Sequence, residues 1–289
     1  MQAFELNEID LQLVNLALQE DLGLVYKDLT TQTLFDIEST AYHTEIISKN
    51  ETPIVLCGLP VAQAILGCFQ KDFELTTSFR DGDIIEPKAT ILKLEGDANT
   101  LLMAERTILN FMRRLCAVAT ITKQFVDKIK NTETKILDTR KTTPGWRHLE
   151  KYAVACGGGV NHRFGLYDVI MIKDTHTDLL GGMDKAIEKL PEKTQDTPKV
   201  IVEVRDIDEL NTVIKLGANK VNRVLLDNMS PALMKQCVQL CKDIFETEAS
   251  GNLNLKTIKS VAASGVDYAS VGMITHSAGN VDLSMKAIN

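Results

Sequence analysis

The stretch KVIVEVRDIDELNTVIKLGANKVNRVLLD, residues 199–227, decides the fold. Its two apolar runs, residues 199–204 and 223–227, have the length and composition of buried strands, and residues 206–216 between them are helix-like. A strand, a helix and a second strand in this order predict two parallel strands joined by a right-handed crossover.

The same alternation continues on both sides of this stretch. Four further strand-like runs, of which the third is the weakest, occupy residues 135–138, 169–173, 243–248 and 268–272. Residues 231–241 are again helix-like. Strands that alternate with helices in this way predict a closed α/β barrel, in which the chemistry sits at the C-terminal ends of the strands.

The first part of the chain has a different pattern. Residues 9–22 predict an amphipathic helix that ends at Gly23, and residues 61–69 predict a second helix. A long helical stretch follows at residues 101–129.

Short strands are expected between these helices, at residues 44–48, 73–79 and 90–94. The turn at residues 80–83 separates the second of these runs from Ile84 and Ile85, which predicts a hairpin between them. We therefore expect an N-terminal α+β layer with an antiparallel sheet.

Length and composition fit a globular protein. Of the 289 residues, 44% are apolar and 25% are charged, which excludes disordered, collagen-like and coiled-coil chains. The net charge of −7 argues against nucleic-acid binding. The first 13 residues are acidic and lack the features of a signal peptide. Residues 54–69, the most apolar stretch, are too few and too interrupted to span a membrane.

The six cysteines are scattered along the chain and contain no Cys-x-x-Cys pair. Cys237 and Cys241 are one helical turn apart, which would suit a metal, but no histidine or carboxylate ligand set accompanies them. We therefore expect buried, reduced thiols and a cytoplasmic location.

The residues at the ends of the predicted barrel strands form a regular series. In an α/β barrel these positions converge on one rim. Here they are almost all charged or glycine-rich: Asp138-Thr139-Arg140-Lys141, Lys173-Asp174, Glu203, Asp227-Asn228, Glu248, Ser250-Gly251-Asn252 and Gly272.

The rim is locally basic in an acidic protein. Residues 138–176 hold six basic and four acidic residues and three of the five histidines. A solvated basic face is the ordinary explanation for such a cluster. Because Arg140, Lys141 and Lys173 stand at strand ends, a pocket for a small polyanion is favoured.

The late strands and the two rim acids indicate more specific roles. Small residues after the last two strands, in Ser250-Gly251-Asn252 and at Gly272, are typical of a phosphate site in a barrel, although each alone would be a plain turn. Glu203 and Asp227 could hold Mg²⁺, bind ribose hydroxyls or stabilise positive charge on a sugar carbon. A salt bridge to a rim lysine is the alternative.

An ordered series of motifs carries a resemblance to a known family. Four motifs lie close together: ILDTRKTTPG (136–145), LEKYAV (149–154), CGGGVNHR (156–163) and IKD (172–174). Shorter ones are EDLG (20–23), DLTT (28–31), AERTILN (104–110), LLDN (225–228), SGN (250–252), GVDY (265–268) and SVG (270–272). In these motifs the chain resembles the quinolinate phosphoribosyltransferases.

The resemblance implies the fold and assembly of a type II phosphoribosyltransferase. An N-terminal α/β sandwich domain is implied for residues 1–112, with the tail, residues 277–289, packing back on it. A partly open α/β barrel is implied for residues 113–276. The implied assembly is a homodimer, or a hexamer built from dimers, in which one subunit's N-terminal region closes the other's barrel.

The resemblance also implies a reaction. Phosphoribosyl pyrophosphate and quinolinate would give nicotinate mononucleotide, pyrophosphate and CO₂, a step of NAD biosynthesis, with Mg²⁺ as cofactor. The implied catalytic residues are Lys141, Glu203 and Asp227, of which the two acids would hold the metal. The implied quinolinate ligands are Arg106 (reaching across the dimer), Arg140, His162, Arg163 and Lys173. The implied ligands of phosphoribosyl pyrophosphate are Thr139, Lys141, Glu203, Asp227, Ser250, Gly251, Asn252, Val271, Gly272 and Met273.

Two positions depart from the family pattern. Thr175 replaces an asparagine, which leaves the role of that position open. Arg205 replaces an acidic residue, and we expect it to point outward because strand side chains alternate.

Three rival functions are compatible with the sequence. The chain could be a related type II phosphoribosyltransferase with another acceptor, or a sensor without catalysis on the same scaffold. It could also be a barrel aldolase that uses Lys173 as a Schiff base. The basic rim favours a dicarboxylate acceptor, and retention of Lys141, Glu203 and Asp227 argues against a sensor.

Overall fold

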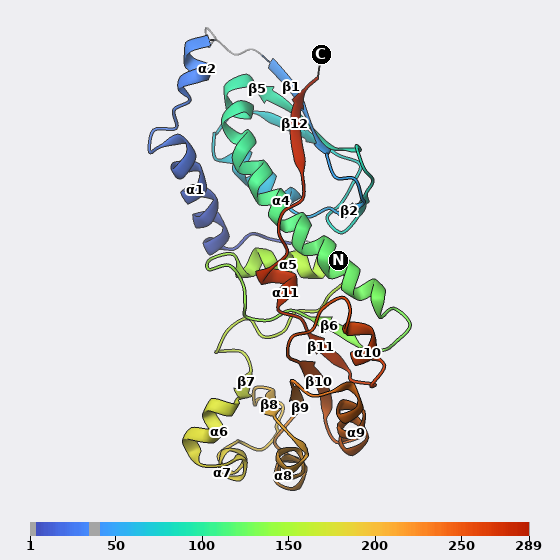
Figure 1. Cartoon of the computed structure of the whole chain (residues 1–289). Helices are drawn as coiled ribbons and strands as arrows, with labels where there is room; N and C mark the ends of the chain where they lie inside the picture. Colours follow the sequence, from blue (N-terminus) through green and yellow to red (C-terminus); the bar gives the residue numbers. More distant parts are fainter. Residues whose placement is uncertain (1–3, 35–40, 289) are drawn as a thin grey trace. The chain divides into compact units, whose positions relative to one another are not determined.

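The computed structural model describes residues 4–34 and 41–288 (Figure 1). The chain divides into two compact units. One comprises Met1–Lys123, Thr142–Gly158 and Ser277–Asn289, and the other comprises Gln124–Lys141 and Gly159–His276. The first boundary falls at Lys123, whereas the family resemblance implies residue 112, and residues 142–158 return to the first unit.

In the first unit, helix α1 (Glu8–Leu22) matches the predicted helix. Asn7 and Asp10 form a capping box at its start, with backbone N–H to side-chain oxygen distances of 2.9 and 3.0 Å. Gly23, with φ of 72°, ends it. The predicted long stretch is one uninterrupted helix, α4 (Ala98–Lys128). The remaining helices of this unit are α2 (Leu29–Leu34), α3 (Leu59–Gly67) and α5 (Arg147–Cys156).

A four-stranded antiparallel sheet, as predicted, forms the other layer of this unit. Its strand order is β12-β1-β5-β3, so the C-terminal strand pairs with the first strand of the chain. The strands are β1 (Ala41–Ser48), β3 (Phe73–Thr76), β5 (Thr90–Asp97) and β12 (Leu283–Ala287).

The predicted hairpin is wrong. Strand β4 (Ile84–Ile85) pairs with β2 (Ile54–Val55), whereas β3 pairs with β5. The reason is the carboxylate of Asp81, which accepts the backbone N–H groups of Gly58 and Leu59 at 2.9 and 3.2 Å. These bonds tie the turn to the segment after β2.

The second unit is built on a six-stranded parallel sheet in the order β6-β11-β10-β9-β8-β7. Its strands are β6 (Lys135–Leu137), β7 (Ile170–Ile172), β8 (Val200–Val204), β9 (Arg223–Asp227), β10 (Glu246–Ser250) and β11 (Tyr268–Ser270). Among the described residues, β6 and β7 remain edge strands that do not pair with each other. The barrel is therefore partly open, as the resemblance implies, and the closed barrel expected from the alternation alone is wrong.

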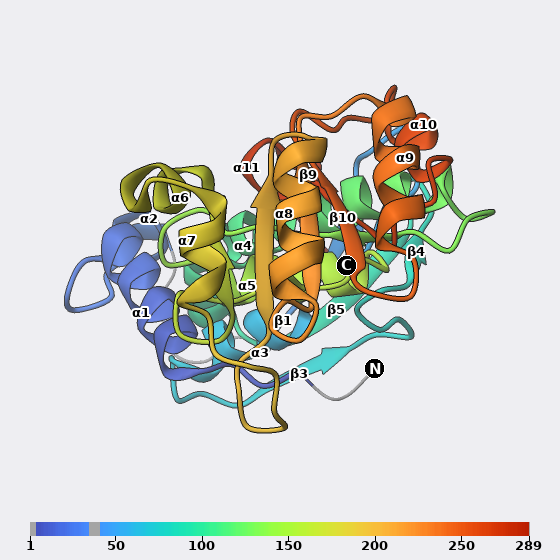
Figure 2. The ribbon, with the colours of Figure 1, turned by 90° about the horizontal axis from the view of Figure 1, so that it is seen from below.

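Helices alternate with the strands of this sheet along the chain. Their bounds are α6 (Asp174–Leu180), α7 (Met183–Glu188), α8 (Ile207–Gly217), α9 (Pro231–Cys241), α10 (Ile258–Ala262) and α11 (Met273–His276). Figure 2 shows α7, α8 and α9 in a row along the sheet. Side-chain caps at Asp206 and Ser230 begin α8 and α9 close after the strands β8 and β9. Because these connections are short, they leave the C-terminal ends of the strands accessible to a ligand.

The weakest predicted strand is displaced along the sequence. Strand β10 begins at Glu246, three residues after the predicted start at Asp243. Asp243 has a φ of 62° and belongs to a turn after α9. The displacement adds Ser250 to the strand, opposite Asp227 of β9.

The helices among the described residues include none that combines the length and the apolar character needed to cross a membrane.

The bonds of Asp81 give a test of the first unit. We expect Asp81→Ala to lower the free energy of unfolding by about 3 kcal/mol, because two backbone N–H groups and the Tyr152 hydroxyl lose their acceptor. Chemical denaturation measures this. Asp83→Ala, in the same turn, removes an exposed acceptor for one N–H group and is expected to cost about 1 kcal/mol. Equal losses would contradict this account of the turn.

Candidate functional site

Two adjoining cavities lie at the C-terminal ends of the parallel strands, and both belong to the second unit. They share Thr139, Lys141, Asp227, Ser250 and Ser270. The first is also lined by Arg140, His162, Arg163, Met171, Lys173, Glu203, Leu225 and Glu248. The second is also lined by Asn228, Gly251, Asn252, Leu253, Asn254, Gly272, Met273 and His276.

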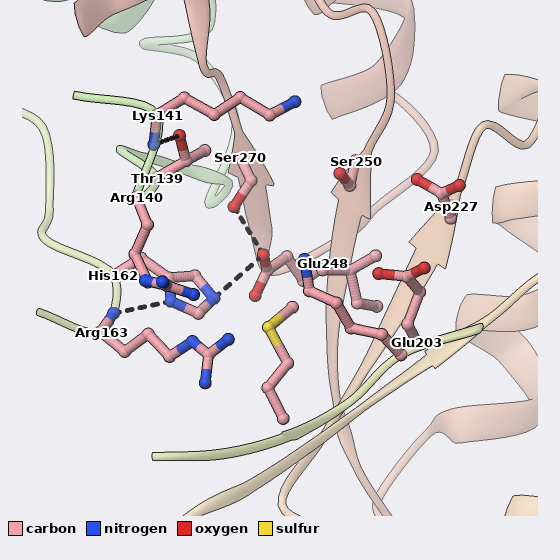
Figure 3. A pocket seen from close by; sticks show the side chains of 13 residues that line it. Thr139, Arg140, Lys141, His162, Arg163, Glu203, Asp227, Glu248, Ser250 and Ser270 are labelled. Carbon is pink, nitrogen blue, oxygen red and sulfur yellow. Dashed lines mark hydrogen bonds and ion pairs between the residues drawn. The ribbon is translucent and has the colours of Figure 1, made fainter. Parts of the chain in front are cut away.

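Basic side chains line one side of the first cavity. Figure 3 shows Arg140 and Arg163 there, across the cavity from Glu203 and Asp227. Burial and the charge of Arg140 lower the pKa of Arg163, and Asp168 partly offsets this. Two arginines that repel each other at a buried wall are suited to bind an anion with more than one negative charge.

Arg163 is held in place by its surroundings. It is 9% exposed, and its Nη1 donates to the carbonyl oxygen of Val169 at 3.1 Å. This bond holds one side of the guanidinium group. Arg163 also lines the cavity.

The opposite side of the cavity is acidic. Burial raises the pKa of Glu203, the negative charge of Asp227 raises it further, and Lys173 opposes both. Glu203 comes from β8 and Asp227 from the end of the neighbouring strand β9. Two adjacent carboxylates suit a hard cation such as Mg²⁺, or the hydroxyl groups and positive carbon of a sugar.

The second cavity is formed by the loops after β10 and β11. Gly251 has a φ of 102°, and a Cβ atom there would lie 2.2 Å from Oδ1 of Asn228. At Gly272 a Cβ atom would lie 3.2 Å from Cδ of Lys141. Glycine is required at 251 by the positive φ and the close Asn228, and at 272 it leaves room beside the side chain of Lys141, which is an arrangement that suits a phosphate group.

Lys141 lies between the two cavities. Its backbone N–H donates to Oγ1 of Thr139 at 3.0 Å, and its carbonyl oxygen accepts the hydroxyl of Thr275 at 2.8 Å. These bonds fix the loop after β6, while the side chain of Lys141 lines both cavities.

Most of the residues that the sequence predicts for the site line these two cavities. Val271 does not: it is buried, and its N–H donates to the carbonyl oxygen of Leu137 at 2.9 Å. Arg106 lies on α4 in the first unit, where its side chain is 58% exposed and 3.8 Å from Glu105. The implied role of Arg106 concerns a second subunit and stays a prediction.

The two departures from the family pattern are both exposed. Arg205 points outward as expected, with 47% of its side chain exposed. It pairs with Glu209 at 2.6 Å and with Asp178 at 3.2 Å. Thr175 is exposed in the first turn of α6.

Sequence reasoning gave no role to several lining residues. Met171 and Leu225 supply an apolar floor, and their alternation along β7 and β9 could have indicated it. The sequence shows Glu248 only as a strand-end acid, whereas in the structure it is fully buried and bonded to Ser270 and Arg223. Arg223 stands at the start of its strand, and nothing in the sequence links it to Glu248.

Comparisons with known proteins agree with this geometry. Residues 28–116 match the model of the quinolinate phosphoribosyl transferase N-terminal domain, and residues 118–286 match that of the C-terminal domain. A probable carboxylating nicotinate-nucleotide pyrophosphorylase of Bacillus subtilis is 36% identical, over 97% of this chain and 94% of its own length. The decarboxylating quinolinate phosphoribosyltransferase 1b of Nicotiana tabacum is 35% identical, over 94% of this chain and 81% of its own length.

A solved structure shows the same fold. The nicotinate-nucleotide pyrophosphorylase of Francisella tularensis superimposes with a TM-score of 0.90 at 37% identity, over 99% of this chain and 98% of that one. The strand-end cavities, both family models and the relatives over nearly the whole length lead to one conclusion: this chain belongs to the quinolinate phosphoribosyltransferase family.

Proposed function

We propose that the chain transfers the phosphoribosyl group of phosphoribosyl pyrophosphate to quinolinate, with decarboxylation. The products are nicotinate mononucleotide, pyrophosphate and CO₂, and the reaction is a step of NAD biosynthesis. The observation that carries this is one cavity with a basic wall opposite an acid pair, next to a glycine-lined second cavity (Figure 3). A dicarboxylate acceptor and a phosphorylated sugar need these environments side by side.

The basic wall is the acceptor side in this proposal. Quinolinate carries two carboxylates, and Arg140, Arg163 and Lys173 offer three positive charges to them. The flat ring lies against the apolar floor of Met171 and Leu225. Arg106 of the partner subunit supplies a further positive charge from outside the barrel.

The acidic side and the second cavity receive phosphoribosyl pyrophosphate. Glu203 and Asp227 face the ribose, and Thr139 and Lys141 contact the same substrate at the junction of the two cavities. The 5′-phosphate occupies the glycine-lined cavity, formed by Ser250, Gly251, Asn252, Gly272 and Met273.

The chemistry then needs fixed charge and orientation more than a protein nucleophile. Pyrophosphate leaves the anomeric carbon with the bonding electron pair, and positive charge develops there opposite Glu203 and Asp227. The lone pair of the quinolinate ring nitrogen forms the new bond to this carbon. The resulting pyridinium stabilises the electron pair left on the ring when the 2-carboxylate departs as CO₂, and a proton then takes its place.

Glu203 and Asp227 also fit Mg²⁺. They are two carboxylates close enough for the charge of Asp227 to add to burial in raising the pKa of Glu203, and Mg²⁺ in enzymes is commonly bound by one or two carboxylates and substrate phosphates. Held by these two carboxylates, Mg²⁺ would supply positive charge to the departing pyrophosphate.

The rival functions are weaker on specific grounds. A neutral acceptor would not need the positive charges of Arg140 and Arg163 at the cavity wall. A sensor without catalysis would not need Lys141, Glu203 and Asp227, all of which line the cavities. A Schiff-base aldolase that used Lys173 would need neither the acid pair opposite the arginines nor the phosphate cavity.

The assembly that we propose is a homodimer, or a hexamer of dimers, in the cytoplasm. The six cysteines are all free thiols, and five of them are buried, as suits a reducing compartment. Light scattering is expected to give twice or six times the mass of one chain, and cell fractionation to find the protein in the cytoplasm. A monomer that is fully active would contradict the shared site.

The reaction itself is tested with purified protein, quinolinate, phosphoribosyl pyrophosphate and Mg²⁺. We expect nicotinate mononucleotide and CO₂ in equal amounts, because one decarboxylation accompanies each transfer. Nicotinate and nicotinamide in parallel tubes are expected to give no product, and removal of divalent metal by a chelator is expected to stop the reaction. Product from nicotinamide alone would indicate another acceptor, and no product in any tube would favour the sensor.

The proposed division of the site, into a basic side for quinolinate and a separate side for phosphoribosyl pyrophosphate, is tested by Arg140→Ala. We expect quinolinate binding to weaken about 10- to 100-fold through loss of charge-assisted hydrogen bonds, with phosphoribosyl pyrophosphate binding nearly unchanged. Calorimetric titration with each ligand separately measures both. Arg205→Ala removes an exposed arginine outside the cavities and is the matched control. An equal loss of both ligands in Arg140→Ala would show that the division is wrong.

A further inference from the structure

Asn228, the residue after strand β9, has a strained backbone conformation. Its φ is 52°, which lies in the left-handed region where glycine is the least costly residue. Asn228 is exposed and lines the second cavity. Neither the charge pattern of the rim nor the family resemblance gives it a role. Strained residues of this kind cluster at functional sites, so the contacts of its carboxamide need an explanation.

One end of this carboxamide binds Asp227. Nδ2 of Asn228 donates to Oδ2 of Asp227 at 2.7 Å, which is the short distance typical of a hydrogen bond to a charged acceptor. A carboxylate accepts and does not donate, so the NH₂ group of the carboxamide faces Asp227. The carboxamide oxygen therefore faces the other way.

The other end of the carboxamide meets the loop after β10. A Cβ atom on Gly251 would lie only 2.2 Å from Oδ1 of Asn228, so the loop backbone packs directly against this oxygen. Nδ2 of Asn252 donates to the same oxygen at 3.5 Å. The backbone N–H of Asn228 donates to the carbonyl oxygen of Ser250 at 3.0 Å. Asn228 thus joins Asp227 to each residue of this loop.

These contacts place Asn228 between the two parts of the proposed site for phosphoribosyl pyrophosphate. Asp227 and Ser250 lie opposite each other at the ends of β9 and β10 (Figure 3). In the proposed function Asp227 faces the ribose, and the loop that begins at Ser250 receives the 5′-phosphate. Asp227 is half-buried at the cavity, where a carboxylate can turn between rotamers unless a neighbour holds it.

We infer that Asn228 is a positioning residue, which holds the carboxylate of Asp227 toward the ribose and fixes its place relative to the loop that receives the 5′-phosphate. This inference rests on the proposed function, because it takes the ribose to lie opposite Asp227. The carboxamide engages Oδ2 of Asp227, and Oδ1 is left for a ribose hydroxyl group. The acid and the loop are then arranged before the substrate enters, at the cost of a strained backbone.

Two substitutions remove the bond to Asp227 in different ways. Asn228→Gly deletes the carboxamide and suits the backbone, because glycine adopts a positive φ without strain. Asn228→Asp tolerates the same φ but has no N–H group to donate. Asp243→Gly is the matched control, because Asp243 also has a positive φ, of 62°, and lies outside both cavities. Thermal unfolding checks that all three variants are folded.

Calorimetry with ribose 5-phosphate and with inorganic phosphate tests the inference without turnover. We expect Asn228→Gly and Asn228→Asp to weaken ribose 5-phosphate binding about tenfold, the value of one charge-assisted hydrogen bond. Inorganic phosphate, which does not reach Asp227, is expected to lose no more than about twofold. Asp243→Gly is expected to change neither ligand. An equal loss of both ligands in Asn228→Gly would show that Asn228 supports only the phosphate loop, and would overturn the inference.

A double-mutant cycle separates positioning from direct contact with the ligand. Asp227→Ala is expected to weaken ribose 5-phosphate binding by itself. If Asn228 acts through Asp227, adding Asn228→Gly to this variant weakens binding by no more than about twofold, because the two changes remove one interaction. A full tenfold loss in the Asp227→Ala background would identify the carboxamide as a direct ligand and would overturn the positioning role.

Crystal structures of the unliganded protein and of Asn228→Gly test the positioning independently of any ligand. We expect one orientation of the Asp227 carboxylate, bonded to Asn228, in the unchanged protein and a turned or divided orientation in the variant. The same single orientation in both would overturn the inference, whether or not ribose 5-phosphate binds. If no transfer reaction is found while the orientation of Asp227 changes as expected, the proposed function alone fails, so the two failures are distinguishable.

Discussion

The register of the parallel sheet is the constraint on which the site depends. Backbone hydrogen bonds place Glu203 opposite Leu225 and Ser250 opposite Asp227 on neighbouring strands, so the strand ends open at a common edge. In a parallel ladder every strand runs the same way, and the loops after the strands therefore meet there. A shift of one residue in β9 would turn Asp227 to the opposite face of the sheet and remove it from the cavities.

At this edge the two arginines lie across the first cavity from the acid pair, whereas the charge of Lys173 acts on Glu203. Arg140 comes from the loop after β6 and Arg163 from the loop between α5 and β7, whereas Glu203 and Asp227 come from the strands β8 and β9 across the cavity. If these groups were adjacent they would form ion pairs, and a substrate would first have to break them. On opposite sides of the cavity, the arginines face the place proposed for the anionic acceptor and the carboxylates face the place proposed for the ribose, and the fold bears the cost of holding like charges together.

Glu248, which lies behind the residues just named, shows what it takes to hold a charge inside this fold. Glu248 is an ionised group inside the sheet, and it is tolerable only because β9 supplies Arg223, β11 supplies Ser270 and the loop before β7 supplies His162. Each partner comes from a different segment, so the network forms only when the sheet is assembled. Through His162 the same network fixes the backbone at Arg163, which links the stability of the sheet to the geometry of the acceptor side.

The sequence by itself determined the elements and the chemistry of the rim. Apolar runs with polar residues at their ends located β6, β7, β8, β9 and β11, and the charged or glycine residues after them indicated a polyanion site, because both signals are local. Only the tertiary structure decided that β4 pairs with β2, that β6 and β7 remain edges, and that Arg223 and Glu248 form a pair. Pairing partners and buried charge networks join residues far apart in the chain, and their energies depend on burial and distance, which no local pattern encodes.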